Sequence, residues 1–516
     1  MNHFIQKYED NTIGVLSGFD RLVLRGTLRG LAFTAGMMSF LSRMGVLLKD
    51  FGGYVQKTSE RLKEASCEAA RRLERPIVYL PSAQTRKEDM ARQIAERDGI
   101  REGLICILTC VEPCRSYEVH RDRSQKKLVL EPRLRKCLYL YHYWIDPFFG
   151  LMHGRIQSWF PFGIQVCLNG REWLARQMDR QGMAYRRRKN CFPWIEDLPR
   201  AQQWMDRQPR ISWPSILRRI ARQLNPAQRA ILGGTGMEYY WSVHQSEWAT
   251  DVLFKSSAAL ASIYPGLVRG GIAVFSSRDV MRFLGKKPHG NFQGEVISDY
   301  RQRPEGIRVK HQLKQNSIKI YDKQGSVLRV ETTINDPSDF RVFRPKQDAP
   351  EGPCQWQPMR KGIADLRRRT EVSQACNERY LDGLASLSTD QPLADLLTPV
   401  CRPTQWKGRR VRALQPWSPE DRSLLQAINR GEFALNGIRN RDLVATLFPR
   451  SLDSSEEKHS ASGRVTRKLR LLRAHGILRK VPRTHRYVLT ERGRQITVAA
   501  LQYQDLTLEQ LNKTAA

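Results

Sequence analysis

The chain has 516 residues, of which 86 are Lys or Arg and 52 are Asp or Glu, so its formal net charge at pH 7 is +34. This excess adds self-repulsion, whereas binding a polyanion would neutralise it and release condensed counterions. We therefore expect a nucleic-acid partner. No apolar run reaches the ~18 residues that a membrane span needs, and the polar N-terminus does not resemble a secretion signal. Ten scattered cysteines favour a reducing, cytoplasmic location.

The first 180 residues predict a mixed α/β domain, 1–180. Residues 19–28 alternate apolar and polar side chains as a half-buried strand does, and residues 58–73 have the composition of a surface helix. Residues 154–160 and 164–169 indicate paired strands. Asn169 then predicts a helix start, because its side chain can accept hydrogen bonds from the free N–H groups of a first turn.

Residues 181–344 predict a second domain of Arg- and Trp-rich helices followed by an antiparallel β-meander. Helices are expected over residues 180–232 and 239–248, and the strands of the meander over residues 306–313, 317–323 and 326–334. Aromatic side chains interleaved with Arg, as in the helical part, suit stacking on unpaired bases.

The turn between the last two strands decides which side chains share a face. Gln324-Gly325 forms a two-residue loop whose glycine favours a primed hairpin turn. Period-two alternation then places Asp322, Arg329 and Glu331 on one face. Carboxylate oxygens are the ligands that Mg²⁺ and Mn²⁺ prefer, so we expect Asp322 and Glu331 to bind one such metal beside a scissile phosphate. A salt-bridged sheet face without a metal is the alternative.

A tyrosine nucleophile for such a site has to come from another element. Tyr321 lies on the opposite face of its strand, so Tyr239 and Tyr240 are the candidates. Several further carboxylates could serve a metal, and three of them, at positions 20, 146 and 172, have a spacing that permits a transposase-like triad. These further carboxylates are Asp20, Asp146, Glu172, Glu238, Glu247 and Asp251.

The central strands also carry a short family resemblance. Lys319-Ile320-Tyr321-Asp322-Lys323, followed by Arg329-Val330-Glu331, resembles a segment of rolling-circle replication initiators, in which a Tyr-Asp-Lys strand precedes an Arg-x-Glu strand. The resemblance implies a nicking enzyme with a carboxylate-bound divalent metal and a tyrosine nucleophile. The chain departs from that pattern in lacking a His-apolar-His pair.

Residues 345–417 predict a Pro-containing linker with one helix. Prolines cluster over residues 345–358, one helix is expected over residues 362–384, and residues 402–417 are basic.

Residues 418–516 predict a compact helical domain with a β-hairpin. Ser418, Asn440 and Ser462 are expected to start three helices, and Gly476 to end the third. In that third helix Val465, Leu469 and Leu472 fall on one face and leave basic side chains on the other. Strands over residues 477–481 and 487–490 flank a basic turn.

This order of elements, with the run Tyr487-x-Leu489-Thr490-x-x-Gly493, resembles the winged-helix regulators, including the MarR-like class. The resemblance implies that the third helix enters a DNA groove while the wing contacts phosphates. The side chains expected to contact DNA are Arg464, Arg467, Lys468, Arg470, Arg473, Arg483 and Arg486.

The sequence thus predicts an α+β multidomain chain, with mixed α/β N-terminal and central regions and a C-terminal winged helix. The favoured function is a DNA-binding protein of a mobile element or plasmid, transposase- or initiator-like, that nicks or joins DNA or initiates replication. A non-enzymatic winged-helix transcriptional regulator and a structured-RNA-binding protein are the alternatives. The expected partner is double-stranded DNA, with RNA as the alternative, and neither a membrane nor a small-molecule ligand is expected.

Overall fold

The computed structural model describes residues 1–124, 126–286, 295–303, 306–387, 393–429, 437–448 and 454–504. The chain divides into two compact units, each assembled from separated stretches. The sheet unit comprises Ile13–Leu253 and Ser326–Ala375, and the terminal unit comprises Met1–Thr12, Phe254–Gly325 and Cys376–Ala516. Each unit is described by itself below.

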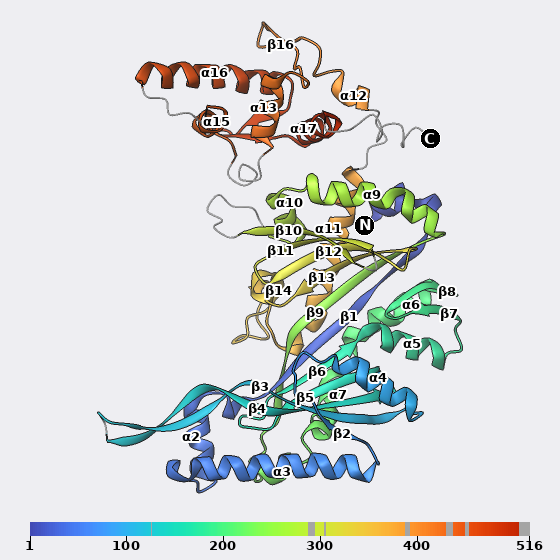
Figure 1. Ribbon diagram of the computed structural model, residues 1–516, viewed down its shortest axis with the longest axis vertical. Helices are drawn as coiled ribbons and strands as arrows, with labels where there is room; N and C mark the ends of the chain where they lie inside the picture. Colours follow the sequence, from blue (N-terminus) through green and yellow to red (C-terminus); the bar gives the residue numbers. More distant parts are fainter. Residues whose placement is uncertain are drawn as a thin grey trace. The chain divides into compact units, whose positions relative to one another are not determined.

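The sheet unit is built on a large mixed sheet, shown in Figure 1. Its strands follow the order β13-β9-β1-β6-β5-β4-β3-β2. The pairs β1–β6, β9–β13, β3–β4, β4–β5 and β5–β6 are antiparallel, whereas β2 runs parallel to β3. The strands are β1 (Thr12–Leu28), β2 (Ile77–Tyr79), β3 (Gly103–Asp122), β4 (Lys127–Asp146), β5 (Gly150–Gln157), β6 (Ile164–Asn169), β9 (Tyr239–Phe254) and β13 (Val327–Ile334).

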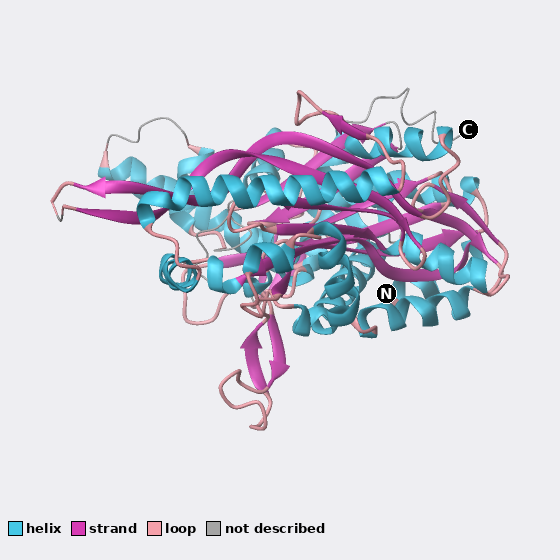
Figure 2. Cartoon of the chain, turned by 90° about the horizontal axis from the view of Figure 1, so that it is seen from below, coloured by secondary structure: helices cyan, strands magenta, loops and turns pink. Residues whose placement is uncertain are grey.

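The predicted strands of the N-terminal region are confirmed, and one of their neighbours is longer than expected. β1 contains residues 19–28, and β5 and β6 pair as predicted. β3 and β4 extend beyond their pairing with β5 as a two-stranded ribbon, which is seen at the left of Figures 1 and 2.

Helices bury the apolar side chains of this sheet in one large core. The core joins residues such as Leu22 of β1, Leu62 of α3 and Leu217 of α7. α5 begins where predicted, since the Asn169 side chain accepts hydrogen bonds from the backbone N–H groups of Arg171 and Glu172. The helices are α2 (Thr34–Arg43), α3 (Phe51–Arg72), α4 (Lys87–Arg97), α5 (Gly170–Arg180), α6 (Leu198–Arg207), α7 (Trp213–Leu224) and α8 (Gln228–Leu232).

Two helical predictions in this unit were wrong. Residues 239–248 belong to strand β9, in which Tyr239, Trp241 and Val243 are buried while Tyr240 and His244 are exposed. That alternation has the period of a strand, and aromatic and β-branched residues favour strands. Within residues 180–232, the stretch around Lys189 is a hairpin of β7 (Tyr185–Arg188) and β8 (Cys191–Ile195).

The Pro-rich stretch expected to be a linker also contains regular structure. β14 (Arg341–Arg344) pairs with β15 (Gln355–Pro358) in an antiparallel hairpin. The single helix predicted after it is present as α11 (Leu366–Leu387). Further along, β16 (Thr404–Trp406) pairs with β17 (Arg409–Val411).

The terminal unit contains the first two strands of the predicted meander, β11 and β12, and a strand before them, β10, that was not predicted; the third predicted strand is β13 of the sheet unit. β10 (Val296–Arg303), β11 (Gly306–Leu313) and β12 (Asn316–Lys323) pair in antiparallel order. Gln324 and Gly325, which follow β12, have φ values of 63° and 81°, the positive values that a primed turn requires. The unit also contains α1 (Asn2–Lys7), α9 (Ser257–Ala273), α10 (Ser277–Phe283) and α12 (Leu393–Leu397).

The C-terminal segment of this unit has its own apolar core, to which Leu424, Leu443, Leu469 and Ile477 contribute. Its elements are α13 (Pro419–Ile428), α15 (Asn440–Leu447), α16 (Ser455–Ala474), β18 (Leu478–Lys480), β19 (Tyr487–Leu489) and α17 (Glu491–Gln504).

Two of the helix starts predicted in this segment are confirmed. Ser418 caps α13 by accepting from the N–H of Asp421, and α15 begins at Asn440. The third helix, however, begins at Ser455 and not at Ser462. Ser454 and Glu457 form a capping box there, which satisfies the free N–H groups of the first turn about two turns before the predicted start.

Within the described ranges, no single helix combines the length and the apolar composition needed to cross a membrane. The bent pair Ser257–Ile272 and Ser277–Phe283 would meet that requirement jointly, on length and composition alone.

Candidate metal centre and polar groove

Three carboxylates from three adjacent strands meet in the sheet unit. Asp20 lies on β1, Glu247 on β9 and Glu331 on β13, and these strands are neighbours in the sheet. One oxygen from each carboxylate lies within 4.8 Å of the other two. Asp20 and Glu331 are buried and Glu247 is half-buried. We call these three residues the acid cluster, and their oxygen ligands suit a divalent cation such as Mg²⁺ or Mn²⁺.

Strand register explains why these side chains share one face. In the β9–β13 ladder Asp251 pairs with Arg329 and Ala249 pairs with Glu331. Alternate residues of a strand point to the same side, so Glu247 and Asp251 share a side of β9, as do Arg329 and Glu331 on β13.

Arg329 connects the acid cluster to a second carboxylate. Its guanidinium donates to both oxygens of Asp251, at 2.5 and 2.8 Å, and to Asp20 at 3.1 Å. It also donates to the Asn190 carbonyl at 2.8 Å. The Arg329 side chain is fully buried, so its charge is balanced by these partners and not by water. Two carboxylates are thereby held at fixed positions.

Two further groups complete this network. The Asn190 side-chain amide donates to both oxygens of Asp20, at 2.7 and 2.9 Å. Arg171, which is also fully buried, lies 3.0 Å from Asp251, and burial lowers the pKa of its guanidinium. Asp20 is therefore held in its orientation by the donors Asn190 and Arg329.

The charges around the acid cluster nearly cancel. Four carboxylates, Asp20, Glu247, Asp251 and Glu331, lie among three guanidinium groups, Arg21, Arg171 and Arg329. Burial disfavours the charged form of Arg21, but nearby acids, Glu247 foremost among them, outweigh it and raise the Arg21 pKa. This count leaves one net negative charge, so a bound divalent cation would change the local charge from −1 to +1.

A cavity of about 410 Å³ is connected to the acid cluster through two of its lining residues. It is lined by Arg21 and by Gln245, whose amide donates to Glu247 at 2.9 Å. A second cavity, of about 230 Å³, shares the lining residues Arg155 and Gln165 with the first and adds Arg25. We call the two together the polar groove, and its lining residues come mostly from β1, β3, β4, β5, β6, β9 and α4.

The floor of the polar groove combines fixed positive charge with aromatic rings. Arg155 donates to Glu112 at 2.7 Å, to the Tyr141 hydroxyl at 2.9 Å and to Gln165 at 2.6 Å. Its guanidinium lies 4.9 Å from the centre of the Tyr139 ring. Burial disfavours its charge, but the Tyr141 hydroxyl and Glu112 raise the Arg155 pKa overall. These contacts keep the group charged and hold it still.

His153 supplies a neutral ring to the same floor. Burial lowers its pKa to about 4, so the imidazole is uncharged near pH 7. It stacks on Tyr143 with ring centres 4.9 Å apart. The Tyr139, Tyr141 and Tyr143 rings are buried, so they pack against Arg155 and His153 and are not free to stack on bases.

The two predicted metal ligands, Glu331 and Asp322, do not lie at one site. Glu331 belongs to the acid cluster, whereas Asp322 does not. Asp322 lies on β12, where its carboxylate accepts a hydrogen bond from the Gly325 N–H at 2.9 Å and its pKa is raised by burial. Its observed partner is thus the turn that follows its own strand.

The two predicted tyrosines lie side by side on β9 in different surroundings. The Tyr239 hydroxyl donates to the Phe162 carbonyl at 2.9 Å and accepts from Asn225 at 3.0 Å, and burial raises its pKa. Tyr240 is 38% exposed, with the Arg29 guanidinium 3.3 Å from its ring centre. Tyr239 is therefore engaged in the core, whereas the ring of Tyr240 reaches the surface.

The other carboxylates considered from the sequence divide into members of the acid cluster and ion-pair partners. Asp20 and Glu247 join Glu331, a combination that the sequence did not indicate. Asp146 instead lies 2.7 Å from Arg219, and Glu172 pairs with Arg187. The triad at positions 20, 146 and 172 is thus not brought together within the described part of the chain.

The predicted DNA-contacting residues of the C-terminal segment also fall into two groups. Arg464, Arg467, Arg470 and Arg483 are exposed. The other three, Lys468, Arg473 and Arg486, are half-buried. Lys468 lies 2.5 Å from Glu420 and is only 11% exposed, and the Arg473 guanidinium lies 4.8 Å from the centre of the Trp406 ring.

Comparisons of the chain with family models, with curated proteins and with solved structures give no match.

Proposed function

We propose that the chain binds DNA and cuts or rejoins its backbone, as proteins of plasmids and mobile elements do. The observation that carries this proposal is an acid cluster that is hydrogen-bonded, through Gln245, to an Arg-lined groove in a chain of net charge +34. Carboxylates beside arginines are the combination that phosphoryl chemistry needs, since one set holds a metal and the other neutralises the phosphate.

In this proposal the residues have separate roles. Asp20, Glu247 and Glu331 would hold Mg²⁺ or Mn²⁺, which supplies Lewis-acid stabilisation of a phosphate oxygen when bound. Arg21 and Arg155 would bind the phosphates of the strand that lies in the polar groove. Arg329 and Asn190 position Asp20, because they already bond its oxygens.

We further propose that the C-terminal segment is a winged helix that binds double-stranded DNA. The order of its described elements, three helices, a hairpin and a closing helix, supports this assignment. So do the exposed arginines of α16, which lie opposite the buried Val465 and Leu469. A helix with an apolar back and a basic front has the shape that a major groove accepts.

One observation favours a non-enzymatic binding protein as the second candidate. Arg329 already bonds Asp20 and Asp251, so the carboxylates also make sense as a buried ion-pair network. In that case the polar groove would bind a strand, of DNA or of structured RNA, without cutting it.

The test combines metal binding with cleavage. Glu247→Gln and Glu331→Gln keep the side-chain size and remove the charge, and Glu238→Gln, on an exposed ion pair, is the matched control. We expect Mn²⁺ to bind the wild type and the control, measured calorimetrically, and to bind either cluster variant at least about tenfold more weakly. DNA from the flanks of the gene should be nicked with metal by the wild type and the control only. Equal Mn²⁺ binding by all four proteins would refute the metal centre, and binding without cleavage of any DNA would leave the binding-protein candidate.

A further inference from the structure

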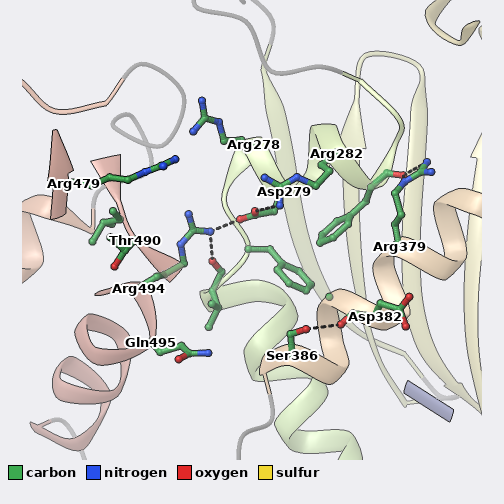
Figure 3. Close-up of a pocket in the computed structure, with 15 residues that line it drawn as sticks. Arg278, Asp279, Arg282, Arg379, Asp382, Ser386, Arg479, Thr490, Arg494 and Gln495 are labelled. Atoms are coloured by element: carbon green, nitrogen blue, oxygen red, sulfur yellow. Dashed lines mark hydrogen bonds and ion pairs between the residues drawn. The ribbon is translucent and has the colours of Figure 1, made fainter. Parts of the chain in front are cut away.

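A cavity of about 650 Å³ lies within the terminal unit (Figure 3). One wall comes from α10 and the residues just before it, a second from the Cys376–Leu387 part of α11, and a third from β18, β19 and the start of α17. Its size falls within the range of 300–1,000 Å³ that is usual for small-molecule sites.

Positive charge dominates the walls. Five arginines line the cavity, Arg278, Arg282, Arg379, Arg479 and Arg494, against two acids, Asp279 and Asp382. Figure 3 shows Arg479 and Arg494 reaching from the C-terminal segment toward α10, which carries Arg278 and Arg282. A cavity whose lining carries a net charge of +3 favours an anion.

Some of these charges are already used. Arg494 forms an ion pair with Asp279, and Arg379 donates to the Phe283 carbonyl at 2.9 and 3.1 Å. Asp382 pairs with the amino group of Met1.

The other three arginines are less engaged. Arg282 lies 3.9 Å from Asp279, at the outer limit of an ion pair. Arg278 and Arg479 have no ion pair with any residue that the structure describes. Three guanidinium groups can therefore bind a ligand. A guanidinium group can donate two parallel hydrogen bonds to two oxygens of one phosphate.

The same cavity has an apolar side. Phe275 and Phe283 contact each other edge to face with ring centres 4.7 Å apart, and Val274 and Leu489 complete the apolar lining. Phe275 is half-buried, so part of its ring can pack against a flat ring, whereas Phe283 is buried and supports it.

We infer that this cavity binds a nucleoside phosphate, with the base against Phe275 and the phosphate on Arg278, Arg282 and Arg479. The ligand is either a free nucleotide or the phosphorylated end of a nucleic-acid strand, which share this chemistry. The inference is independent of the acid cluster, which belongs to the other unit. It differs from the expectation from sequence that no small-molecule ligand binds.

Binding here should also affect the C-terminal segment. Arg479, Leu489 and Arg494 belong to the hairpin and closing helix of the proposed winged helix. A phosphate in the cavity would compete with Asp279 for Arg494 and so alter the contact that holds α17 to α10. If the ligand changes the DNA affinity, DNA must change the ligand affinity by the same factor.

The test uses the full chain without added metal. AMP, ATP and a 5′-phosphorylated dinucleotide are titrated by calorimetry, with adenosine and the 5′-hydroxyl dinucleotide as uncharged-end controls. We expect saturable binding at one site by at least one phosphorylated probe, and at least about tenfold weaker binding by its control. The mononucleotide and dinucleotide arms tell a free nucleotide from a strand end.

Variants then locate the site. Arg278→Ala and Arg479→Ala should each weaken binding about tenfold or more, the loss of one charge-assisted contact. Arg492→Ala, on the same helix as Arg494 but outside the cavity lining, is the matched control. Arg278→Lys, which keeps the charge but not the fork, should bind with intermediate affinity, and melting curves verify folding. Equal affinities for Arg278→Ala, Arg479→Ala and Arg492→Ala, or no phosphate preference in any probe pair, would overturn the inference.

Discussion

Removing Arg329 should destabilise the sheet unit more than removing any exposed arginine. The change Arg329→Met keeps most of the side-chain volume and deletes the guanidinium. Asp251 would lose its two hydrogen bonds from that group, at 2.5 and 2.8 Å, and Asp20 would lose one at 3.1 Å. Both carboxylates are almost completely buried, so water cannot replace the lost donors.

The size of the effect follows from that burial. Removing one partner of a buried ion pair costs about 3–5 kcal/mol, because the remaining charge is left uncompensated. Arg171, 3.0 Å from Asp251, would offset part of the loss. We therefore expect the free energy of unfolding of the sheet unit to fall by about 3 kcal/mol, and its melting temperature to fall by roughly 5–10 °C.

The matched control is Arg218→Met. Arg218 lies 3.4 Å from Glu238, with both side chains more than half exposed, and such pairs contribute about 0–1 kcal/mol. Urea unfolding followed by Trp fluorescence measures both variants. If Arg329→Met loses no more stability than Arg218→Met, the buried network does not stabilise the sheet unit in the way argued.

Three further predictions address binding and pH. Arg467→Ala should weaken binding to specific duplex DNA by about 1–3 kcal/mol if the side chain contacts a base, whereas Lys468→Ala, whose partner is Glu420, should change it little; fluorescence anisotropy measures both. DNA affinity of the wild type should fall by about 10³–10⁵ between 50 and 200 mM salt, as for ~6–10 phosphate contacts, and a flat salt profile would contradict a role for the +34 charge in DNA binding. Burial lowers the pKa of His142 to about 4, so folding keeps the ring neutral and stability should decrease as the pH falls from about 6.5 toward 4. At pH 5 this amounts to about 2 kcal/mol relative to pH 7, and His142→Gln should show that much less acid sensitivity in urea unfolding.

Local features of the sequence were enough to predict many elements. Strand β1, the meander strands β11 and β12, and the helix caps at Asn169 and Ser418 depend on periodicity and on side chains within a few residues. The primed turn at Gln324-Gly325 is local in the same sense. Physical preferences that act over one turn or one strand can be read directly from neighbouring residues.

The acid cluster could not be predicted in the same way, because its members come from distant parts of the chain. Arg329 and Asp20, for example, are 309 residues apart. The incorrect helix over residues 239–248 also placed Glu247 on the wrong kind of element. The alternation of buried Trp241 and Val243 with exposed Tyr240 and His244 was the available signal for a strand. Even with that correction, the pairing of β9 with β13 is non-local, and Glu331 would have kept Asp322 as its apparent partner.

The charge balance around the acid cluster separates its two possible roles. If the cluster holds a metal, Arg329 lowers the local negative charge and so weakens cation binding, while it also stabilises the unit. Arg329→Met should then bind Mn²⁺ at least about tenfold more tightly than the wild type, and millimolar Mn²⁺ should restore part of the lost stability, since a ligand that binds only the folded state stabilises it. If the cluster is only an ion-pair network, the same variant loses stability and Mn²⁺ restores none of it. The two roles therefore agree on the loss of stability and differ in the response to the metal, which makes Mn²⁺ addition to this one variant the decisive comparison.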